Sequence, residues 1–534
     1  MEKLIITLTL SGASAALLTL CSLKMLQMYQ LSSYRAGGFF KWLARSKGDY
    51  AIRYFALAFF QFVSLIIFNF SFSRSPLPYL TYLGLILYVA LGVMFVVLQK
   101  KQKQKTPLKF TSRIIRQIIL LAVVYCGLCF TAVYFVFDYA LGYALLGVMA
   151  FLIPLCVTFT HFLALPVEIL INRHYFIKAR RRLSAGMIKI GITGSYGKTT
   201  AKNILCTFLS KKYKVVGTPA SINTPMGICK LVNGGGLTDC EIFVAEMGAR
   251  RRGDIKTLCK LVNPDHGIIT AVGSQHLETF KTIEAVTVTK LELARGAKGF
   301  VVVNSGDNRL CEGVLALLDE IGGEGKTEKE RFLYAGIGGT DARFEDVALG
   351  AEGTQFTLVI GDEGVEITTP LLSRHVPPLI ASCALLAHKL GVSLTDIQAA
   401  AVELQPVPHR LQLIKTGANI VIDDAYNSNP EGAKDALEVL GCFAGAKLVI
   451  TPGFVELGAE EAGENLKLGG NIAKTADFLI SVNNAEVFRG AAEAGMDPDC
   501  CFVEKSLDGA MERLAALKLE RATVLFLNDL PDNY

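Results

Sequence analysis

Long hydrophobic runs fill the first third of the chain and then stop. Five of them are about as long as a bilayer is thick, at Leu4–Leu23, Ala51–Phe70, Leu80–Leu98, Ile118–Phe137 and Leu141–Pro166. No small-residue cleavage site follows the first run, so we do not expect a secretory signal peptide there. The pattern predicts a multi-span α-helical membrane domain, an anchor with five helices over residues 1–185.

Basic residues between the runs indicate how this anchor is oriented. Lys and Arg gather after the first, third and fifth runs, whereas the second connection has only Arg74 and the fourth, around Asp138, has neither. The three clusters are Arg35, Lys41, Arg45 and Lys47; Lys100, Lys101, Lys103, Lys105, Lys109, Arg113 and Arg116; and Arg173, Lys178, Arg180, Arg181 and Arg182. Because cytoplasmic connections carry the excess of Lys and Arg, we predict a multi-pass cell-membrane protein with its N-terminus outside and the catalytic domains in the cytoplasm. The same topology explains the net charge of +6 without a nucleic-acid partner.

Other polar groups in the apolar region have simple interpretations. Asp138, His161 and Glu168 stand singly or near the ends of runs, so we interpret them as interfacial residues of an anchor. The 13 cysteines show no paired metal-ligand spacing apart from Cys126-x-x-Cys129, which lies within an apolar run and is interpreted as two buried thiols. Scattered free cysteines fit a reducing cytoplasm.

From Met187 onward, short apolar runs alternate with helical stretches such as Lys198–Ser210 and Glu431–Leu440. The runs are unbroken and rich in β-branched residues, which is typical of parallel strands covered on both faces. They are Ile188–Thr193, Ile242–Ala245, His266–Thr270, Phe300–Val303, Ile420–Asp423, Lys447–Ile450, Phe478–Val482 and Thr523–Leu527.

This alternation predicts α/β architecture in two domains. The first is a P-loop-type central ATPase domain over residues 186–410, and the second is a Rossmann-like C-terminal domain over residues 411–534. The Pro-containing segment Gln405–His409 is the predicted hinge between them. Asp341–Pro370, which is rich in Gly and Asp, is interpreted as a small excursion.

The strongest local motif is a glycine-rich segment between a strand and a helix. It reads Gly194-Ser195-Tyr196-Gly197-Lys198-Thr199-Thr200. Glycines let the backbone wrap closely around phosphate oxygens, and a helix N-terminus offers free N–H donors. We expect Lys198 to meet the β- and γ-phosphates of ATP and the Thr199 hydroxyl to bind Mg²⁺. The strict P-loop pattern has a glycine where this chain has Ile192, so a plain glycine turn that opens a helix is the alternative.

A second candidate in the central domain is Glu246, which follows the apolar strand Ile242–Ala245. In a parallel sheet this position places the carboxylate at the carboxyl edge, beside the phosphate loop and within reach of Mg²⁺. The alternative is an ordinary surface glutamate.

The hinge and the last domain supply further candidates. Arg410, at the hinge, would reach the γ-phosphate when the domains close. Asp424 ends a strand, from which it would meet the ribose or a metal from the opposite side. Asn427 and Asn429 would line the cleft, unless they only form an Asx turn before Pro430.

Seven motifs in this order resemble those of the Mur ligase family, and within it the branch that adds D-alanyl-D-alanine, over about residues 187–534. Besides the phosphate loop, the resemblance rests on Glu246-Met247-Gly248-Ala249, His276-Leu277-Glu278 with Lys290, Asn304-Ser305-Gly306-Asp307, Arg410-Leu411, Asp423-Asp424-Ala425-Tyr426-Asn427-Ser428-Asn429-Pro430 and Thr451–Gly458.

The resemblance implies roles that the residues alone leave open. His276, otherwise a generic loop histidine, would bind Mg²⁺ or orient substrate. Lys290, otherwise a helix-surface lysine paired with Glu292, would carry a carbamate that holds a second Mg²⁺. The implied catalytic residues are Lys198, His276, Lys290 and Arg410. The implied nucleotide-binding residues are Gly194, Ser195, Gly197, Lys198, Thr199, Thr200, Asn304, Arg410, Asp424, Asn427 and Asn429, and the implied metal ligands are Thr199, Glu246, His276 and Lys290.

The resemblance also implies a reaction. A carboxylate is a poor electrophile, so ATP would convert it to an acyl phosphate, which an amine then captures. The implied function is an ATP-dependent amide ligase of peptidoglycan precursor synthesis that adds D-alanyl-D-alanine or a similar amine to a muramoyl peptide. ATP and Mg²⁺ are the implied cofactors.

The chain departs from the family pattern in three places. His375-Val376-Pro377-Pro378-Leu379 stands where the family has H-N-x-x-N, an asparagine of which contacts adenine, so recognition of the base is left open. Near Asn223, a pair of asparagines is reduced to one. The membrane runs replace the family's soluble UDP-sugar-binding domain, which makes a lipid-linked peptide acceptor a natural hypothesis.

Two other functions stay open. One is a membrane-tethered poly-γ-glutamate or capsule peptide ligase, and the other is a catalytically weak scaffold that recruits wall-synthesis proteins. The E-M-G-A and D-D-x-Y-N-x-N-P motifs favour the peptidoglycan ligase over the capsule ligase, whereas the altered H-N-x-x-N motif favours the scaffold. Amine-dependent release of ADP would distinguish the three.

Overall fold

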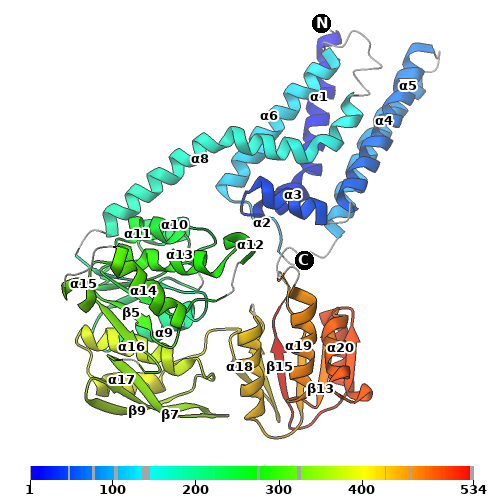
Figure 1. Ribbon diagram of the computed structural model, residues 1–534. Helices are drawn as coiled ribbons and strands as arrows, with labels where there is room; N and C mark the ends of the chain where they lie inside the picture. The colour runs from blue at the N-terminus through cyan, green and yellow to red at the C-terminus, as the bar shows by residue number, and fades with distance from the viewer. Residues whose placement is uncertain are drawn as a thin grey trace. The chain divides into compact units, whose positions relative to one another are not determined.

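The computed structural model describes residues 2–45, 49–74, 78–101, 106–134, 145–183, 186–220, 222–273, 277–320, 326–338, 340–426, 429–455, 457 and 460–529. The chain divides into two compact units, one up to Arg173 and one from His174 onward. The first is helical, and the second contains both sheets (Figure 1).

The described part of the first unit consists of apolar helices. They are α1 (Glu2–Cys21), α2 (Leu23–Leu31), α3 (Ala36–Arg45), α4 (Asp49–Arg74), α5 (Pro78–Lys101), α6 (Ser112–Tyr134), the 3-10 turn η1 (Met149–Leu152) and α8 (Ile153–Leu183), whose last turns belong to the second unit. Four buried tyrosines, Tyr29, Tyr54, Tyr88 and Tyr125, are among the largest side chains of its core.

Three helical stretches in the described residues are long and apolar enough to cross a membrane, at Thr7–Leu31, Ser112–Tyr134 and Leu145–Leu183. They correspond to the first, fourth and fifth predicted runs. Shorter apolar stretches at Ile52–Ile66 and Ile86–Gln99 fall within the second and third runs. The connection around Asp138 and the adjoining ends of two runs lie outside the described residues. The five-span anchor therefore stays a prediction.

Helix α4 shows the kind of surface that a membrane would cover. Ile52, Phe55, Phe59 and Phe60 are each more than half exposed, at 64, 58, 51 and 54%. A contiguous row of large apolar side chains of this kind is unusual in water.

The central sheet has nine strands in the order β2-β3-β1-β4-β5-β6-β7-β8-β9. They are β1 (Ile188–Thr193), β2 (Val215–Gly217), β3 (Ile242–Glu246), β4 (His266–Ile269), β5 (Val301–Asn304), β6 (Phe332–Ala335), β7 (Ala342–Gly350), β8 (Gly353–Ile360) and β9 (Glu363–Thr369). The pairs among β1 to β6 are parallel, which confirms the predicted parallel strands of this domain. Because β1 lies between β3 and β4 and pairs parallel with both, the carboxyl ends of these three strands lie at the same edge of the sheet.

Asp341–Pro370 is not an excursion but the antiparallel end of this sheet. Strands β7, β8 and β9 pair antiparallel with one another. Alternate residues of β8, namely Phe356, Leu358 and Ile360, are buried in the same core as α16. The prediction was wrong because Gly and Asp at the turns obscured this alternation, which marks a strand with one solvated face.

Helices cover the sheet on both faces, as unbroken apolar strands require. In β3, Ile242 and Val244 belong to the core on one face, and Phe243 and Ala245 to the core on the other. The helices of this part are α9 (Lys198–Leu209), α10 (Pro225–Asn233), α11 (Asp254–Val262), α12 (Leu277–Phe280), α13 (Ile283–Gly296), α14 (Asn308–Glu320), α15 (Lys326–Glu330), α16 (Val376–Lys389) and α17 (Leu394–Val402).

The last turns of α8 pack on α10. The Arg182 guanidinium donates to the carbonyls of Val232 and Asn233, at 3.1 and 2.6 Å. The side-chain amide of Asn233 donates in return to the Tyr175 carbonyl at 2.9 Å. Leu183 is buried in the core that α10 and α11 share. The end of this helix is therefore part of the α/β unit.

The second sheet has six strands in the order β10-β11-β15-β12-β13-β14. Its elements are β10 (Gln412–Thr416), β11 (Asn419–Asp424), α18 (Pro430–Gly441), β12 (Lys447–Thr451), α19 (Glu461–Ala473), β13 (Phe478–Val482), α20 (Ala485–Glu493), the 3-10 turn η3 (Pro498–Cys500), β14 (Cys501–Glu504), α21 (Leu507–Ala516) and β15 (Thr523–Leu527). All pairs except β10–β11 are parallel. The order differs from that of a dinucleotide-binding Rossmann fold, because β15 returns to lie between β11 and β12. The prediction of a Rossmann-like domain is thus confirmed for the parallel α/β layers, and the structure adds the strand order, which the sequence did not predict.

Candidate functional site

The glycine-rich segment connects β1 to α9, as predicted. Gly197 has a φ of +73°, in the left-handed region that glycine reaches without strain. Ser195 fixes the loop to the next strand connection, because its N–H donates to the Ala271 carbonyl at 2.7 Å and its hydroxyl accepts from the Gly273 N–H at 3.0 Å. The Lys198 ammonium donates to the carbonyls of Gly194 and Ser195 at 2.7 and 2.8 Å. The lysine is therefore held over the loop from which it starts.

Gly194→Ala is expected to disrupt this loop. A Cβ at this position would lie 2.0 Å from the Thr270 hydroxyl and 3.1 Å from the Ala271 amide, so the loop or the β4 connection must move. We expect a loss of about 1–3 kcal/mol in the free energy of unfolding, measured in urea, and weaker binding of a fluorescent ATP analogue.

Gly463→Ala in α19 is the matched control for this substitution, because a Cβ there would meet no atom within 4 Å. It should leave nucleotide binding intact and raise helix stability slightly. Equal behaviour of the two variants would contradict the close packing of the loop.

Glu246 is the last residue of β3 and stands next to Ile192 of β1 in register. Its carboxylate is 1% exposed and accepts a hydrogen bond from the Thr199 hydroxyl at 2.9 Å. The two predicted Mg²⁺ ligands are therefore in contact, and both offer the hard oxygen atoms that this ion prefers. Among the described residues, no three His, Cys, Asp or Glu side chains converge as a metal cage. A single carboxylate and a hydroxyl fit Mg²⁺, which usually keeps waters and phosphate oxygens as its other ligands.

Two residues at this carboxylate received no role from the sequence. Lys202 is 3% exposed, and its ammonium lies 3.6 Å from Glu246 Oε2. The side-chain amide of Asn223 donates to Glu246 Oε1 at 3.0 Å. Lys202 could have been found, since it lies one helical turn after Lys198 on α9. For Asn223 the resemblance marked the position but not its partner, because the long-range fold brings its loop to β3.

Lys290 lies on α13 and is buried, at 3% exposed, rather than being a surface lysine. Burial lowers its pKa to about 8, against the opposing effect of Asp254 and Glu292. The Glu292 carboxylate accepts the N–H groups of Gly253 and Lys256 at the start of α11, both at 2.8 Å. Glu292 thus caps a helix, and the alternative of a surface lysine paired with Glu292 does not describe Lys290.

Lys198 is electrostatically coupled to three candidate residues. Burial and the charges of Lys290 and Arg410 lower its pKa to about 7, against the opposing effect of Glu246. The β3 carboxylate, the α13 lysine and the hinge arginine thus lie within electrostatic range of Lys198. An anion placed among them would restore the ammonium form of Lys198.

Asn304, at the end of β5, supports the phosphate loop indirectly. Its side-chain amide donates to the Thr270 carbonyl at 3.0 Å, and its carbonyl oxygen accepts from the Gly306 N–H at 3.0 Å. Thr270 in turn donates to the Tyr196 carbonyl at 2.5 Å. The nucleotide-binding role of Asn304 stays a prediction.

Arg410 lies in a sharply bent segment. The residues on either side, His409 and Leu411, have φ values of +62° and +45°, which are uncommon outside glycine. The guanidinium lies over the Tyr426 ring, 4.8 Å from its centroid. A hydrogen bond of 2.7 Å between His409 Nδ1 and the Asp423 carboxylate holds this bend against β11.

Asp424 and Asn429 flank the following loop. Burial raises the pKa of Asp424 to about 7, and its carboxylate accepts the Leu411 N–H at 3.3 Å. The Asn429 side chain accepts the N–H groups of Glu431 and Gly432 at the start of α18. These two hydrogen bonds are those expected of the alternative, in which Asn429 forms an Asx turn before α18. A role of Asn429 in binding nucleotide stays a prediction. His276, Asn427 and parts of Thr451–Gly458 lie outside the described residues.

The altered H-N-x-x-N segment opens α16 beside the phosphate loop. Val376 is buried in the core, and the Leu379 side chain lies where a Cβ on Gly197 would meet it, at 2.9 Å. Val376 and Leu379 thus contribute apolar packing where the family pattern has the side-chain amides of asparagine. How the chain recognises the base stays open, as it does from the sequence alone.

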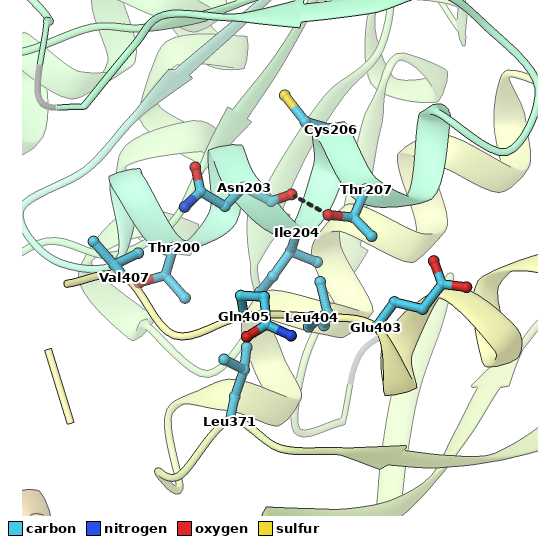
Figure 2. A pocket seen from close by; sticks show the side chains of 10 residues that line it. All are labelled: Thr200, Asn203, Ile204, Cys206, Thr207, Leu371, Glu403, Leu404, Gln405 and Val407. Atoms are coloured by element: carbon cyan, nitrogen blue, oxygen red, sulfur yellow. Dashed lines mark hydrogen bonds between the residues drawn. The ribbon is translucent and has the colours of Figure 1, made fainter. Parts of the chain in front are cut away.

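A pocket of about 290 Å³ lies between α9 and the segment that follows α17 (Figure 2). Figure 2 shows side chains of α9, from Thr200 to Thr207, on one side and the segment Glu403–Val407 on the other. Asn203 and Gln405 bring amide groups to it. The pocket lies next to the helix that begins at the glycine-rich segment, and its lining combines these amide groups with apolar side chains.

Comparison with known proteins agrees with this geometry. The model of the Mur ligase middle domain matches residues 192–385. UDP-N-acetylmuramoyl-tripeptide–D-alanyl-D-alanine ligase of Bacillus subtilis is 31% identical over 276 residues, 50% of this chain and 56% of that protein. The Escherichia coli ligase of the same name is 27% identical over 302 residues, 55% of this chain and 64% of that protein. The chain thus spans between half and two thirds of the length of these relatives.

Solved structures show the same fold. MurF from Acinetobacter baumannii superposes with a TM-score of 0.58 at 23% identity, covering 68% of this chain and 78% of that one. MurF from Thermotoga maritima, solved in complex with ADP, gives 0.55 at 25% identity, covering 67% and 80%. Residues 192–385, from β1 to α16, therefore form a domain that matches the Mur ligase middle domain, and the α/β unit shares its fold with these ligases.

Proposed function

We propose that this protein is an ATP-dependent amide ligase of peptidoglycan precursor synthesis. It would join D-alanyl-D-alanine or a similar amine to a muramoyl peptide. The contact of the Thr199 hydroxyl with Glu246 beside the glycine-rich segment, together with the effects of the Lys290 and Glu246 charges on Lys198, supports this proposal. The names of the relatives, which are ligases for D-alanyl-D-alanine, support the choice of amine.

The reaction divides into two displacements. A carboxylate oxygen of the acceptor attacks the γ-phosphorus of ATP, ADP leaves, and an acyl phosphate forms. The amine nitrogen then attacks the acyl carbon, inorganic phosphate leaves, and the nitrogen loses a proton. Lys198 and Arg410 are the cations that would stabilise the charge on the transferred phosphoryl group. Glu246 and Thr199 would hold Mg²⁺, which neutralises phosphate charge when bound.

Lys290 is proposed to act as a carbamate. The neutral amine attacks the carbon of CO₂ and releases a proton, which turns a buried cation into an anion that can bind metal. With a pKa of about 8, roughly one amine in ten is neutral at pH 7, far more than for a lysine of ordinary pKa. We therefore expect activity at limiting CO₂ to fall as the pH drops from 8 to 6, because protonation removes the nucleophile.

Lys290→Arg tests this role against that of a simple cation. Arginine keeps the positive charge but does not form the carbamate, so the variant should lose activity about as fully as Lys290→Ala, by ~10²-fold or more. Steady-state ADP release in buffers with and without bicarbonate measures both effects. An Arg variant with near-normal activity would show that the charge, and not the carbamate, matters.

We also propose that the helical unit spans the cell membrane and that the α/β unit is cytoplasmic. The three described membrane-length helices, the exposed apolar row on α4 and the alternating basic connections support this location. A lipid-linked peptide would be a suitable acceptor for an enzyme held at the membrane. Labelling of single cysteines in intact cells tests the topology: a C-terminal cysteine that a membrane-impermeant reagent modifies would overturn it.

The ligase function itself is tested by ADP release from the full chain in detergent or vesicles. Release that requires D-alanyl-D-alanine and a muramoyl peptide supports the proposal. Release that requires glutamate would favour a capsule-type ligase. Nucleotide binding without release, whichever amine and acceptor are added, would favour a scaffold.

A further inference from the structure

Charged and aromatic side chains meet where three segments of the helical unit come together. Two arginines lie in the first turns of α6, a histidine and a glutamate on α8, and two tyrosines at the end of α2 and in the turn after it. This arginine cluster consists of Tyr29, Tyr34, Arg113, Arg116, His161 and Glu168. All six residues belong to the first unit, and the ligase chemistry uses none of them.

The cluster carries more positive than negative charge. Arg116 Nε donates to Glu168 Oε1 at 2.8 Å, and Arg113 Nε lies 3.9 Å from Glu168 Oε2. Two guanidinium groups thus share one carboxylate. The glutamate side chain is 5% exposed, whereas those of Arg113 and Arg116 are 29 and 38% exposed. The buried side of the cluster is therefore neutralised, and the accessible side is positive.

Two donors in the cluster have no hydrogen-bond acceptor. The Tyr29 hydroxyl and Arg113 Nε are buried without a hydrogen-bond partner. The Tyr29 side chain is fully buried, its ring lies 5.1 Å from that of His161, and it interacts electrostatically with Arg113. Buried donors are nearly always satisfied in folded proteins, so these two point to an acceptor that binds here.

The cluster also lies at the predicted cytoplasmic ends of the helices. The Gln30 side chain, after the first apolar run, donates to the Lys109 carbonyl at 2.9 Å and accepts its N–H at 3.1 Å. The Arg113 guanidinium lies 3.8 Å from the centroid of the Tyr34 ring. The basic connections after the first and third runs therefore meet on one side. Basic pockets between helices on this side of a membrane typically bind anionic headgroups.

We propose that the arginine cluster binds the phosphate headgroup of an anionic membrane lipid. Phosphate oxygens match the planar donor pattern of guanidinium groups and can also accept from the Tyr29 hydroxyl. A lipid is the favoured source over free phosphate because the surrounding helices expose apolar side chains, Ile115 and Ile119 of α6 among them. This inference rests on the proposed membrane location and is independent of the ligase reaction.

The test uses the full chain in nanodiscs of phosphatidylcholine with or without phosphatidic acid, followed by native mass spectrometry of the lipids that stay bound. We expect phosphatidic acid to be retained in preference to phosphatidylcholine. Arg116→Gln should weaken this retention roughly tenfold or more, because it removes a charge-assisted contact to phosphate. Arg173→Gln, an exposed arginine later on α8, makes the same charge change outside the cluster and should retain the lipid.

Tyr29→Phe removes a single oxygen atom and provides a second test in case the arginine variant does not fold. It should also weaken retention of phosphatidic acid while binding of an ATP analogue stays unchanged. Equal retention by the wild type, Arg116→Gln and Tyr29→Phe would overturn the inference. So would binding of inorganic phosphate in phosphatidylcholine nanodiscs without any preference for phosphatidic acid. If the wild type failed to enter nanodiscs, the proposed membrane location would be refuted together with this inference. If the wild type retained phosphatidic acid but released no ADP, only the ligase proposal would be refuted.

Discussion

Lys198→Ala is expected to lower the rate of ADP release at least ~10³-fold. Its ammonium is held over the phosphate loop by two carbonyl groups and would meet the phosphates that the loop binds. Because the pKa of Lys198 is about 7, wild-type affinity for an ATP analogue should also weaken as the pH rises above 7, when the free protein loses the cation. Fluorescence titration between pH 6 and 9 measures this slope, which should vanish in the variant.

Lys467→Ala is the matched control for the loss of one lysine. This side chain is 71% exposed on α19, where it pairs with Glu464 one turn earlier on the same helix. The control should keep the wild-type rate and the wild-type pH slope. If Lys198→Ala bound and hydrolysed ATP like the control, the glycine-rich segment would be a plain turn that opens a helix.

Glu246→Gln is expected to lower activity about 10²-fold and to raise the Mg²⁺ concentration that gives half-maximal rate. The carboxylate contacts the Thr199 hydroxyl, and an amide binds Mg²⁺ less well than a carboxylate does. The same change leaves the buried Lys202 ammonium without its counter-charge, so the free energy of unfolding should fall by about 1–3 kcal/mol. Urea unfolding and Mg²⁺ titration of ADP release measure the two effects.

The double variant Glu246→Gln/Lys202→Met separates structure from catalysis. Removing both buried charges should recover most of the stability, since an apolar replacement of a buried ion pair is often neutral. Activity should remain low, because the metal ligand is still missing. Recovery of activity together with stability would mean that Glu246 serves only to neutralise Lys202.

Much of the α/β unit follows from local sequence. Unbroken apolar runs predicted the parallel strands, and the glycine-rich segment predicted the β1–α9 connection, because both depend on neighbouring residues alone. The position of Glu246 beside the loop also followed, since carboxyl ends of adjacent parallel strands share an edge. In contrast, the sequence did not predict the antiparallel strands β7 to β9. The Gly and Asp residues of their turns obscure the alternation of apolar and polar positions, and the strands join the sheet through the pairing of β7 with β6.

The sequence alone thus determined the apolar runs, the parallel strands and the candidate residues for binding phosphate and Mg²⁺. Only the tertiary structure decided which distant side chains surround them. It brought Asn223 and Lys202 to Glu246, buried Lys290, and joined Arg113 and Arg116 to Glu168. The physical reason is that burial and charge pairing depend on contacts between segments far apart in the chain, which local patterns do not encode.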